Sequence, residues 1–443
     1  MSHHLQRLAF LSTHSSPLAV PGTTKAGGMN VYITALTRQL GRSGRHVDIF
    51  TRRDSPDLPL TVALDRNVRV VNITAGPPSS LTPLQVHAVE PEFRAGVEAF
   101  VAQDAPAQDA QADRAPTDGA PYDLIHSHYW ISALTGIALA DRWRRPHVAM
   151  FHTLGEVKNR ARRDEREPQL RIDAEREIVA RADRLICATP HEKSFLVELY
   201  GAHADCVSVV PGGVDLERFS PAQPGAAQPG AAQPGANRAQ LRRALGLPSA
   251  PTALFVGRLE PLKGVDILIQ AAGLADVDPA LHVVIVGGDA TDTAERARLQ
   301  GLARAAGVDD RVHFVDAVDR DTLALYYRAA DVCVVPSYYE SFGLVAVEAL
   351  ACGTPVIATR VGGLQYTIRD GQTGHLISWR CPEPFAERLE ALLANDDLRA
   401  RFGLAAPESV QRFDWNVVAE QIVGVYEDLL IRHATGAASC HAS

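Results

Sequence analysis

The sequence predicts an α/β protein with two doubly wound, mostly parallel sheets in tandem, and three observations support this. Short apolar segments alternate with helical segments along nearly the whole chain, which is typical of parallel sheets covered by helices on both faces. The chain has 443 residues, too many for one ordinary core, and fits two domains of roughly 200 residues each. A segment rich in Ala, Gln, Pro and Gly separates two series of predicted strands.

The strands are expected at short runs rich in Val, Ile and Leu. An amphipathic helix is expected from Trp415 to Ile431, where apolar residues recur near helical spacing. The first series of strands is predicted at residues 8–12, 47–51, 68–73, 123–127, 148–153, 184–189 and 207–210, and the second at 253–256, 283–286, 312–315, 332–335 and 356–359.

These elements define the predicted domains. The first is residues 1–215, interrupted at about 102–121 by a low-complexity insert that is too polar to bury. Residues 216–240 form a linker in which Ala-Gln-Pro-Gly-Ala is repeated three times at 222–236, and its Pro and Gly predict a mobile surface loop. The second domain is 241–412, and the terminal helix within 413–443 is expected to cross back to the first domain.

Composition excludes several classes of protein. The chain is 46% hydrophobic and 22% charged, as in a globular protein, and it has no apolar run of about 18 residues that would predict a membrane span. A net charge of -8 argues against general nucleic-acid binding. The polar, Gly-rich sequence after the first strand predicts a cytoplasmic protein. Six scattered cysteines suggest reduced structural thiols, without a disulfide or metal framework. The sequence leaves open whether the protein forms a homodimer.

The second half of the chain carries a set of charges suited to a sugar diphosphate. Arg258 and Lys263 follow the first strand of that half, and Glu340 and Glu348 flank an apolar run about eighty residues later. Breaking a sugar–diphosphate bond leaves negative charge on the departing phosphate, which the two cations would neutralise. Solvated side chains are the alternative for each residue alone.

Backbone groups in the same half suit a nucleotide. Gly257, Gly287 and Gly288 follow predicted strands and remove side chains where a nucleotide would lie; simple turn geometry is the alternative. If a helix starts near Gly343, the backbone of residues 341–344 directs free N–H groups towards a diphosphate. Glu348 would then reach a ribose hydroxyl and Glu340 the sugar. The backbone residues are Ser341, Phe342, Gly343 and Leu344.

The first half suggests a second substrate. Gly28, Met29 and Asn30 stand at a strand-to-helix junction, where backbone N–H groups meet an anion or where the chain simply turns tightly. Gly28 is expected to bind the donor, and Met29 and Asn30 the acceptor. Further polar and aromatic residues follow two predicted strands, at the edge where parallel sheets bind ligands. They include His126, His128, Tyr129, Trp130, His152, Thr153 and Lys158.

Two features of this half have more ordinary interpretations. His128 and His152 resemble metal ligands, but no Cys or carboxylate cluster stands at ligand spacing, so no metal is predicted and hydrogen bonding to sugar hydroxyls is favoured. Residues 160–176 are dense in Arg, Asp and Glu, and most of them are expected on a solvated helix face.

Taken in order, these segments resemble the retaining glycosyltransferases of the GT-B fold, a group that includes sucrose-phosphate synthases, phosphatidylinositol mannosyltransferases and the mycothiol-pathway D-inositol-3-phosphate N-acetylglucosaminyltransferase. The resemblance spans nearly the whole chain and is closest to the last of these. It implies two Rossmann-like domains facing across a cleft, and a UDP- or GDP-linked sugar as donor with no cofactor. It rests on Gly-Gly-Met-Asn-Val-Tyr at 27–32, Leu-Ile-His-Ser-His-Tyr-Trp at 124–130, His-Thr-Leu at 152–154, Val-Lys-Asn at 157–159 and Glu-Ser-Phe-Gly-Leu-Val-Ala at 340–346.

The resemblance also implies roles for individual residues. Arg258 and Lys263 would clamp the diphosphate, Glu348 would bind the ribose, and Glu340 with the 341–344 backbone would hold the sugar and phosphate. His152 would contact the transferred sugar. Tyr129, Thr153 and Arg171 match three of the four residues that hold the acceptor phosphate in the inositol-phosphate enzyme.

The fourth of those residues, a lysine, does not match, because Pro83 stands there. The first expectation is therefore transfer to a small polar acceptor with inositol phosphate as precedent. An acceptor from secondary metabolism that lacks a phosphate or carries a thiol is the alternative. A catalytically silent nucleotide-sugar-binding relative and a sugar-nucleotide epimerase are further alternatives.

Overall fold

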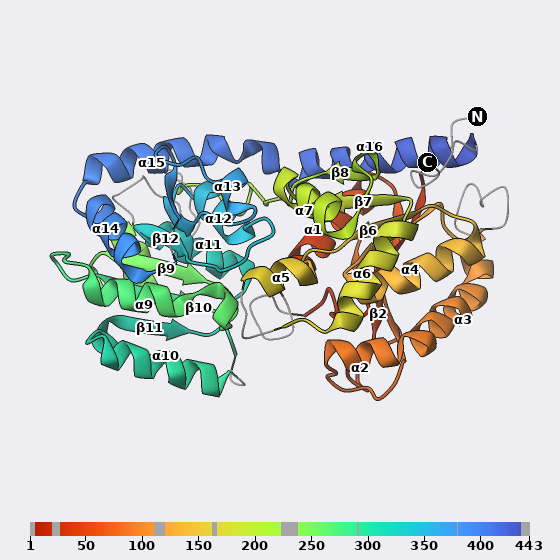
Figure 1. Ribbon diagram of the computed structural model, residues 1–443, viewed down its shortest axis with the longest axis horizontal. Coiled ribbons are helices and arrows are strands. Elements are labelled where there is room, and N and C mark those ends of the chain that lie inside the picture. The colour runs from red at the N-terminus through yellow and green to blue at the C-terminus, as the bar shows by residue number, and fades with distance from the viewer. Residues whose placement is uncertain are drawn as a thin grey trace. The chain divides into compact units, whose positions relative to one another are not determined.

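The computed structural model describes residues 5–19, 27–109, 120–161, 166–222, 238–289, 292–378 and 380–435 (Figure 1). Contacts divide the chain into two compact units: Met1–Ala19, Met29–Pro211 and Trp415–Ser443 form the first, and Val20–Gly28 with Gly212–Asp414 form the second. Nearly all of the tandem repeats at 222–236, and residues 110–119 of the predicted insert, lie outside the described residues.

The first unit contains a sheet in the order β3-β4-β2-β1-β5-β6-β7-β8. All neighbouring strands are parallel except β3 and β4. The strands are β1 Arg7–Leu11, β2 His46–Arg52, β3 Thr61–Asp65, β4 Val68–Ile73, β5 Leu124–His128, β6 His147–Met150, β7 Arg184–Cys187 and β8 Val207–Val209. The helices are α1 Gly28–Arg42, α2 Pro83–Ala88, α3 Glu90–Asp109, α4 Trp130–Trp143, α5 Gly155–Ala161, α6 Gln169–Arg181, α7 Pro190–Tyr200 and α16 Trp415–Ala434, with a 3-10 turn η1 at Ala204–Cys206.

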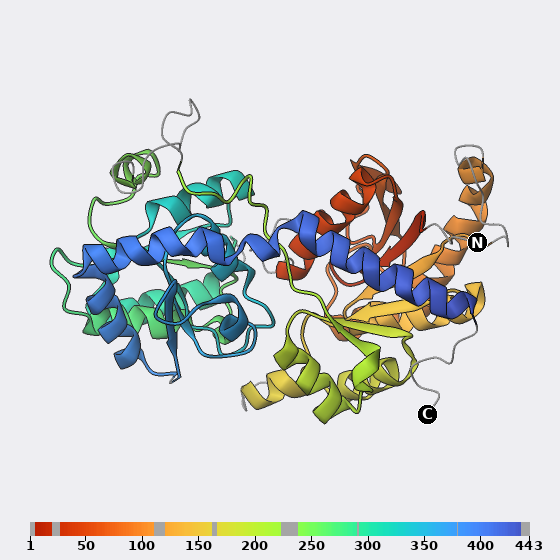
Figure 2. The ribbon, with the colours of Figure 1, turned by 90° about the horizontal axis from the view of Figure 1, so that it is seen from above.

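A core between the sheet and helices α3 and α4 holds the first unit together. Phe93 and Val97 of α3 and Leu139 of α4 join Val71 and Ile73 of β4 in one buried cluster. The C-terminal helix α16 runs along this unit (Figure 2).

Two aromatic side chains of α16 are buried in the first unit. Trp415 packs edge-on against Tyr32 of α1 at 5.5 Å between ring centroids. The Tyr426 hydroxyl lies 2.6 Å from Nδ1 of His126. The last helix is therefore part of the core that supports β5.

The second unit contains a fully parallel sheet in the order β11-β10-β9-β12-β13-β14. The strands are β9 Thr252–Val256, β10 His282–Val286, β11 Val312–Val315, β12 Val332–Val335, β13 Val356–Thr359 and β14 Gly374–Ile377. The α-helices are α8 Arg238–Ala244, α9 Val265–Leu274, α10 Thr293–Ala305, α11 Arg320–Ala329, α12 Leu344–Ala351, α13 Leu364–Thr367, α14 Pro382–Leu393 and α15 Asp396–Ser409, and the 3-10 turns are η2 Pro261–Lys263, η3 Asp309–Arg311 and η4 Gln411–Phe413.

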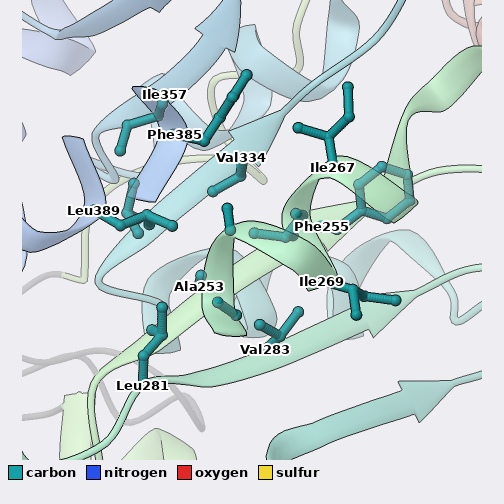
Figure 3. Close-up of a cluster of buried hydrophobic side chains, with 14 of the residues drawn as sticks. Ala253, Phe255, Ile267, Ile269, Leu281, Val283, Val334, Ile357, Phe385 and Leu389 are labelled. Atoms are coloured by element: carbon teal, nitrogen blue, oxygen red, sulfur yellow. The ribbon is translucent and has the colours of Figure 1, made fainter. Parts of the chain in front are cut away.

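Alternate residues of the second sheet build its core. Ala253 and Phe255 of β9 face Ile267 of α9, and the same cluster takes in Val283 of β10 and Phe385 of α14 (Figure 3). Because successive strand residues point to opposite faces, the residues between them face the other helix layer. Helix α11 contacts α8 and α12 there. Two covered faces explain why these strands read as continuous apolar runs.

Most predicted strands agree with the structure to within one residue at each end, with four differences. The segments 148–153 and 184–189 were expected to be longer than β6 and β7, which end at Met150 and Cys187. His152 has φ +59°, which bends the chain out of the sheet, and Thr189 caps helix α7. The strands β3 and β14 were not predicted.

Helix α3 extends to Asp109, into a stretch that the sequence predicted to be an insert from about 102. Among the cysteines within the described ranges, Cys187, Cys206, Cys333 and Cys352 are buried and Cys381 is exposed, and all five are free thiols. In the part of the chain that the structure describes, no helix is both long enough and apolar enough to span a bilayer.

Candidate active site

Two cations and two carboxylates gather where β9 and β12 end in the second unit. Gly257 and Arg258 follow β9, η2 carries Lys263, and Glu340 follows β12, the neighbour of β9 in the sheet. Lys263 Nζ lies 2.8 Å from Oε2 of Glu340, and Arg258 Nη2 lies 3.0 Å from Oε1 of Glu260. Each cation therefore has one carboxylate partner, so the four charges sum to zero.

The backbone holds these two loops together. The Tyr338 N–H donates to the Leu262 carbonyl at 2.8 Å, and the Gly363 N–H donates to the Glu340 carbonyl at 3.0 Å. Gly264 has φ +69°, and a Cβ there would stand 2.1 Å from the Pro336 carbonyl oxygen. A glycine is thus required for the close approach that brings Lys263 to Glu340.

The glycines proposed to approach a nucleotide also have a packing reason. A Cβ on Gly287, at φ +142°, would stand 1.9 Å from the Gly257 carbonyl oxygen, and one on Gly288 would stand 2.9 Å from Leu259 Cδ1. These residues are glycines because the ends of β9 and β10 meet closely.

The predicted helix after Gly343 begins at Leu344 as α12, with Gly343 as its N-cap at φ +93°. Among the described residues no side chain caps this end, so the first backbone N–H groups of α12 have no capping side chain there. The Phe342 ring is buried and packs edge-on against Phe413 at 5.2 Å between centroids. Within the 341–344 segment, the buried Phe342 ring therefore anchors the loop, and Phe342 can offer a ligand only its backbone.

Glu348, expected to bind a ribose, belongs to a buried polar network. Its side chain is 3% exposed, and Oε1 lies 2.7 Å from Arg320 Nη2. Oε2 accepts a hydrogen bond from the Tyr327 hydroxyl at 3.0 Å, and burial together with this carboxylate raises the Tyr327 pKa well above its ordinary value. Arg320 stacks over Phe219 at 4.7 Å. The carboxylate is fixed by partners that the sequence did not indicate.

In the first unit, Arg171 is the centre of a second ion-pair network. Arg171 is 1% exposed, unlike the solvated face expected for this charged stretch. Its Nε lies 2.7 Å from Glu175 Oε1, and its Nη1 lies 2.9 Å from Glu167 Oε2. Its Nη2 donates to the carbonyl and the hydroxyl of Thr153, at 2.7 and 3.0 Å. The structure thus brings together Arg171 and Thr153.

Two further predicted residues join this network. Lys158 pairs with Glu167, and the Arg171 guanidinium lies 4.9 Å from the centre of the Tyr129 ring. Burial opposes the charged form of Arg171, but Tyr129, Glu175 and Glu167 raise its pKa. Arg171 and Lys158 lower the pKa of Glu167 although burial opposes this. Lys158 and Arg171 balance Glu167 and Glu175, so this cluster is also neutral.

The start of α1 makes two kinds of contact: a Cβ on Gly28 would stand 3.2 Å from Leu344 Cδ1 at the start of α12, whereas Asn30 contacts the loop after β1. Asn30 is buried, and its Nδ2 donates to the Ser16 carbonyl and to the Ser15 hydroxyl, at 2.6 and 2.8 Å. Met29 is half-buried, and Gly28, the first residue of α1, groups by contacts with the second unit. The Asn30 side chain therefore ties α1 to the loop after β1. The residues from Val20 to Ala26 lie outside the described ranges.

Comparison with known proteins identifies the family. Residues 26–218 match the family model Glycosyltransferase Family 4, and residues 237–409 match Glycosyl transferases group 1. A relative from Catenulispora acidiphila named D-inositol 3-phosphate glycosyltransferase 2 is 44% identical over 95% of this chain and 94% of its own. A Streptomyces bingchenggensis relative named D-inositol 3-phosphate glycosyltransferase is 43% identical over 96% of this chain and 90% of its own. The chain belongs to this glycosyltransferase family.

Solved structures agree with this assignment. The glycosyltransferase is similar to sucrose-phosphate synthase from Thermosynechococcus elongatus, with a TM-score of 0.84 and 34% identity over 96% of this chain and 99% of the other. It shares its fold with Anabaena Alr3699/HepE, solved in complex with UDP-glucose, at a TM-score of 0.71 and 20% identity over 95% of this chain and 99% of that one. The predicted GT-B fold of nucleotide-sugar-dependent enzymes is confirmed.

Pro83 stands where the related enzyme has its lysine, and the cation beside this segment comes from β2: Arg52 donates to the carbonyls of Pro77 and Ser79, at 2.9 and 2.5 Å. Pro83 is the first residue of α2, where Thr82 is the N-cap and forms a capping box with Gln85. Residues 75–83 contain no Lys or Arg. The glycosyltransferase therefore uses this position to start a helix. In the described ranges, no three His, Cys, Asp or Glu side chains gather in a way that suits a metal ion.

Several site residues were missed at the sequence level. Glu167 and Glu175 stand four positions from Arg171 on either side, so helical spacing alone would have paired them. Arg320 follows β11 at the start of α11, at the same edge of the sheet as Arg258, and the edge rule would have marked it. Tyr426, which contacts His126, gave no local signal because it lies 300 residues away in sequence.

Proposed function

We propose that this glycosyltransferase moves a sugar from a nucleoside diphosphate to a small polar acceptor with retention of configuration. The nearest precedent for the acceptor is 1D-myo-inositol 3-phosphate, because the relatives are named D-inositol 3-phosphate glycosyltransferases. The observation that carries the proposal is the group of Arg258, Lys263 and Glu340 beside the uncapped start of α12. A parallel sheet binds ligands at this edge.

The donor diphosphate would exchange places with carboxylates. Arg258 and Lys263 are now paired with Glu260 and Glu340, and phosphate oxygens can accept charge-assisted hydrogen bonds from them in place of these carboxylates. Once released, Glu340 is free to accept hydrogen bonds from sugar hydroxyls. The N–H groups at the start of α12 add a partial positive charge near the phosphates. Glu348 would accept from a ribose hydroxyl while it keeps Arg320.

The acceptor would meet Tyr129, Thr153, Lys158 and Arg171. Met29 and Asn30, at the start of α1, would complete the acceptor site. Three N–H groups of Arg171 already serve Glu175 and Thr153. An acceptor anion would therefore have to share Nη1 with Glu167, or displace that carboxylate. The Thr153 hydroxyl and the Tyr129 hydroxyl suit either a phosphate or a plain hydroxyl.

Retention follows if the acceptor hydroxyl attacks the anomeric carbon from the face that the diphosphate leaves. The bond from carbon to the phosphate oxygen breaks, the bond to the acceptor oxygen forms, and the leaving phosphate takes the acceptor proton. The protein then supplies alignment and charge stabilisation. His152 would contribute a hydrogen bond to the transferred sugar.

An acceptor without a phosphate is a second candidate, and Pro83 favours it. A lost charge-assisted contact of about 1.5 to 3 kcal/mol weakens phosphate binding by roughly one to two powers of ten. The neutral balance of the Arg171 network offers no excess cation as compensation. Inositol, a thiol-bearing small molecule or another polyol would avoid this cost.

A panel of donors and acceptors tests both candidates. Thermal shifts with UDP, GDP and dTDP sugars identify the donor, and product mass after incubation with myo-inositol, inositol 3-phosphate and a polar thiol identifies the acceptor. The anomeric coupling constant of the product reports retention or inversion. A variant with alanine at Arg258 and Lys263 is the control for donor-dependent turnover. Tight nucleotide binding without transfer or hydrolysis of any donor would instead support a catalytically silent protein.

A further inference from the structure

Three imidazoles form a connected cluster at the carboxyl ends of β5 and β6. His128 Nδ1 lies 2.9 Å from His152 Nε2. The His126 and His128 rings lie 4.3 Å apart, and Phe10 stacks on His128 at 5.4 Å between ring centroids. His126 and His128 are fully buried, while His152 is half-buried. Of the three, only His152 is placed to meet a substrate.

The backbone is strained where this cluster meets the sheet edge. Tyr129 and His152 have φ of +74° and +59°, and both carry a Cβ. Such conformations cost about 1 to 3 kcal/mol each and persist only where the surroundings fix them. The Tyr129 N–H donates to the Met150 carbonyl at 2.9 Å, which ties the two strand ends together. The position of the His152 ring is therefore set by the fold and by its bond to His128.

The hydrogen bond between the two rings selects a tautomer. Burial and the neighbouring imidazoles lower the pKa of His128 well below its ordinary value, and burial lowers that of His152 to about 3. Both rings are thus neutral near pH 7, with one proton each. If His128 donates from Nδ1, His152 accepts at Nε2 and carries its own proton on Nδ1. If His152 donates instead, the proton of His128 lies on Nε2.

The second arrangement is disfavoured by the surroundings of His128. Its Nε2 is buried and has no hydrogen-bond partner among the described residues. Phe10 and Tyr32 pack around this ring. An N–H left without an acceptor is rarer in folded proteins than an acceptor left without a donor. The proton of His128 is therefore favoured on Nδ1.

We propose that His128 is a positioning residue that holds His152 as the Nδ1-protonated tautomer, so that His152 offers a ring N–H to an oxygen of the bound sugar. His128 touches no substrate in this arrangement. The part that concerns the sugar rests on the proposed function, whereas the tautomer is a property of the protein alone.

Long-range proton–nitrogen NMR spectra of the full-length protein, labelled with 15N-histidine, test the tautomer directly. His152→Asn assigns the His152 signals. We expect a protonated Nδ1 and a bare Nε2 for His152 in the wild-type protein. A protonated Nε2 on His152 would overturn the proposal.

Variants of His128 connect the tautomer to turnover. His128→Phe keeps a planar ring but removes the donor, so the His152 signals should change and kcat should fall about tenfold, as for one lost hydrogen bond, with the donor KM unchanged. His128→Asn places an amide N–H close to the former Nδ1 and should restore kcat to within about threefold. Equal losses in both variants, or unchanged His152 signals in His128→Phe, would contradict the proposal.

Tyr426→Phe is the matched control. It removes a buried hydroxyl from His126 in the same cluster and leaves the bond between His128 and His152 in place. We expect unchanged His152 signals, whatever the change in melting temperature. If the wild-type protein transfers no sugar at all, the proposed function fails, and the NMR spectra still decide the tautomer.

Discussion

The ion pair between Lys263 and Glu340 leads to a prediction with opposite signs for nucleotide and for nucleotide sugar. In Glu340→Gln, Lys263 loses a carboxylate that lies 2.8 Å away, so it need not give up a partner to bind a phosphate. Free nucleoside diphosphate should therefore bind more tightly. The intact donor sugar should be processed less well, because Gln accepts weaker hydrogen bonds from its hydroxyls.

The structure sets the size of both effects. The Lys263 and Glu340 side chains are 24% and 17% exposed, so their pairing falls between an exposed pair and a buried one. About 1 kcal/mol for this pair gives roughly fivefold tighter nucleotide binding. Loss of a charge-assisted hydrogen bond to the sugar, about 1.5 to 3 kcal/mol, lowers kcat/KM by roughly one to two powers of ten.

Isothermal titration with UDP or GDP and steady-state kinetics with the matching sugar donor measure the two effects. Glu260→Gln is the matched control, because it frees Arg258 from a carboxylate at 3.0 Å without removing the proposed sugar ligand. Glu260→Gln should tighten nucleotide binding and should not lower kcat/KM with the sugar donor. If nucleotide affinity falls or stays constant in both variants, the carboxylates are not competitors of the diphosphate and the reasoning is refuted.

Three further predictions concern the framework around the sites. Glu348→Gln leaves Arg320 without its carboxylate and should lower stability by about 2 kcal/mol, measured as a lower melting temperature; an unchanged value would show that the network contributes nothing. Gly287→Ala should destabilise the folded protein by more than about 4 kcal/mol, because its Cβ would stand 1.9 Å from a carbonyl oxygen. Gly301→Ala in α10, where the nearest atom that the new Cβ would meet is at 3.8 Å, should stabilise it by up to about 1 kcal/mol. Equal effects of the two substitutions would contradict the packing argument. Burial raises the pKa of Glu192 from 4.5 to about 7, so the unfolded chain loses this proton first and stability falls as the pH rises through this window, by up to about 3 kcal/mol. Glu192→Gln should then melt higher than the wild type at pH 8 but not at pH 4, and equal differences at both pH values would rule out this titration.

Most of the fold could be predicted because strands covered on both faces must be apolar throughout. The segments around Val284 and Val334 are fully buried, and their sequences show it directly. The strand β3 was missed because it is an antiparallel edge strand with only exposed or half-buried residues, so burial leaves no pattern in it. The strand β14 starts at Gly374, which must lack a Cβ because one would stand 1.9 Å from the Val356 carbonyl oxygen. Its sequence therefore resembles a turn.

The candidate site was predictable in position but not in its state of charge. Strand ends mark Arg258, Lys263 and Glu340 because the topology of a parallel sheet brings them to one edge. The pairing of Lys263 with Glu340 joins residues 77 positions apart, and no local spacing encodes it. The burial of Arg171 was also hidden, since a run rich in Arg and Glu is usually solvated.

The pairing of every proposed anion-binding cation with a carboxylate has a functional consequence. A cation held unpaired in a partly buried site would cost stability, and a protein with a net charge of -8 has carboxylates to supply instead. A phosphate then binds by displacing a carboxylate, so only the difference between the two interactions appears as affinity. For a released nucleoside diphosphate the phosphate interaction exceeds the carboxylate interaction by little, so this product can leave. An intact donor binds with a larger net free energy, because the displaced Glu340 gains the hydroxyls of the sugar as new partners.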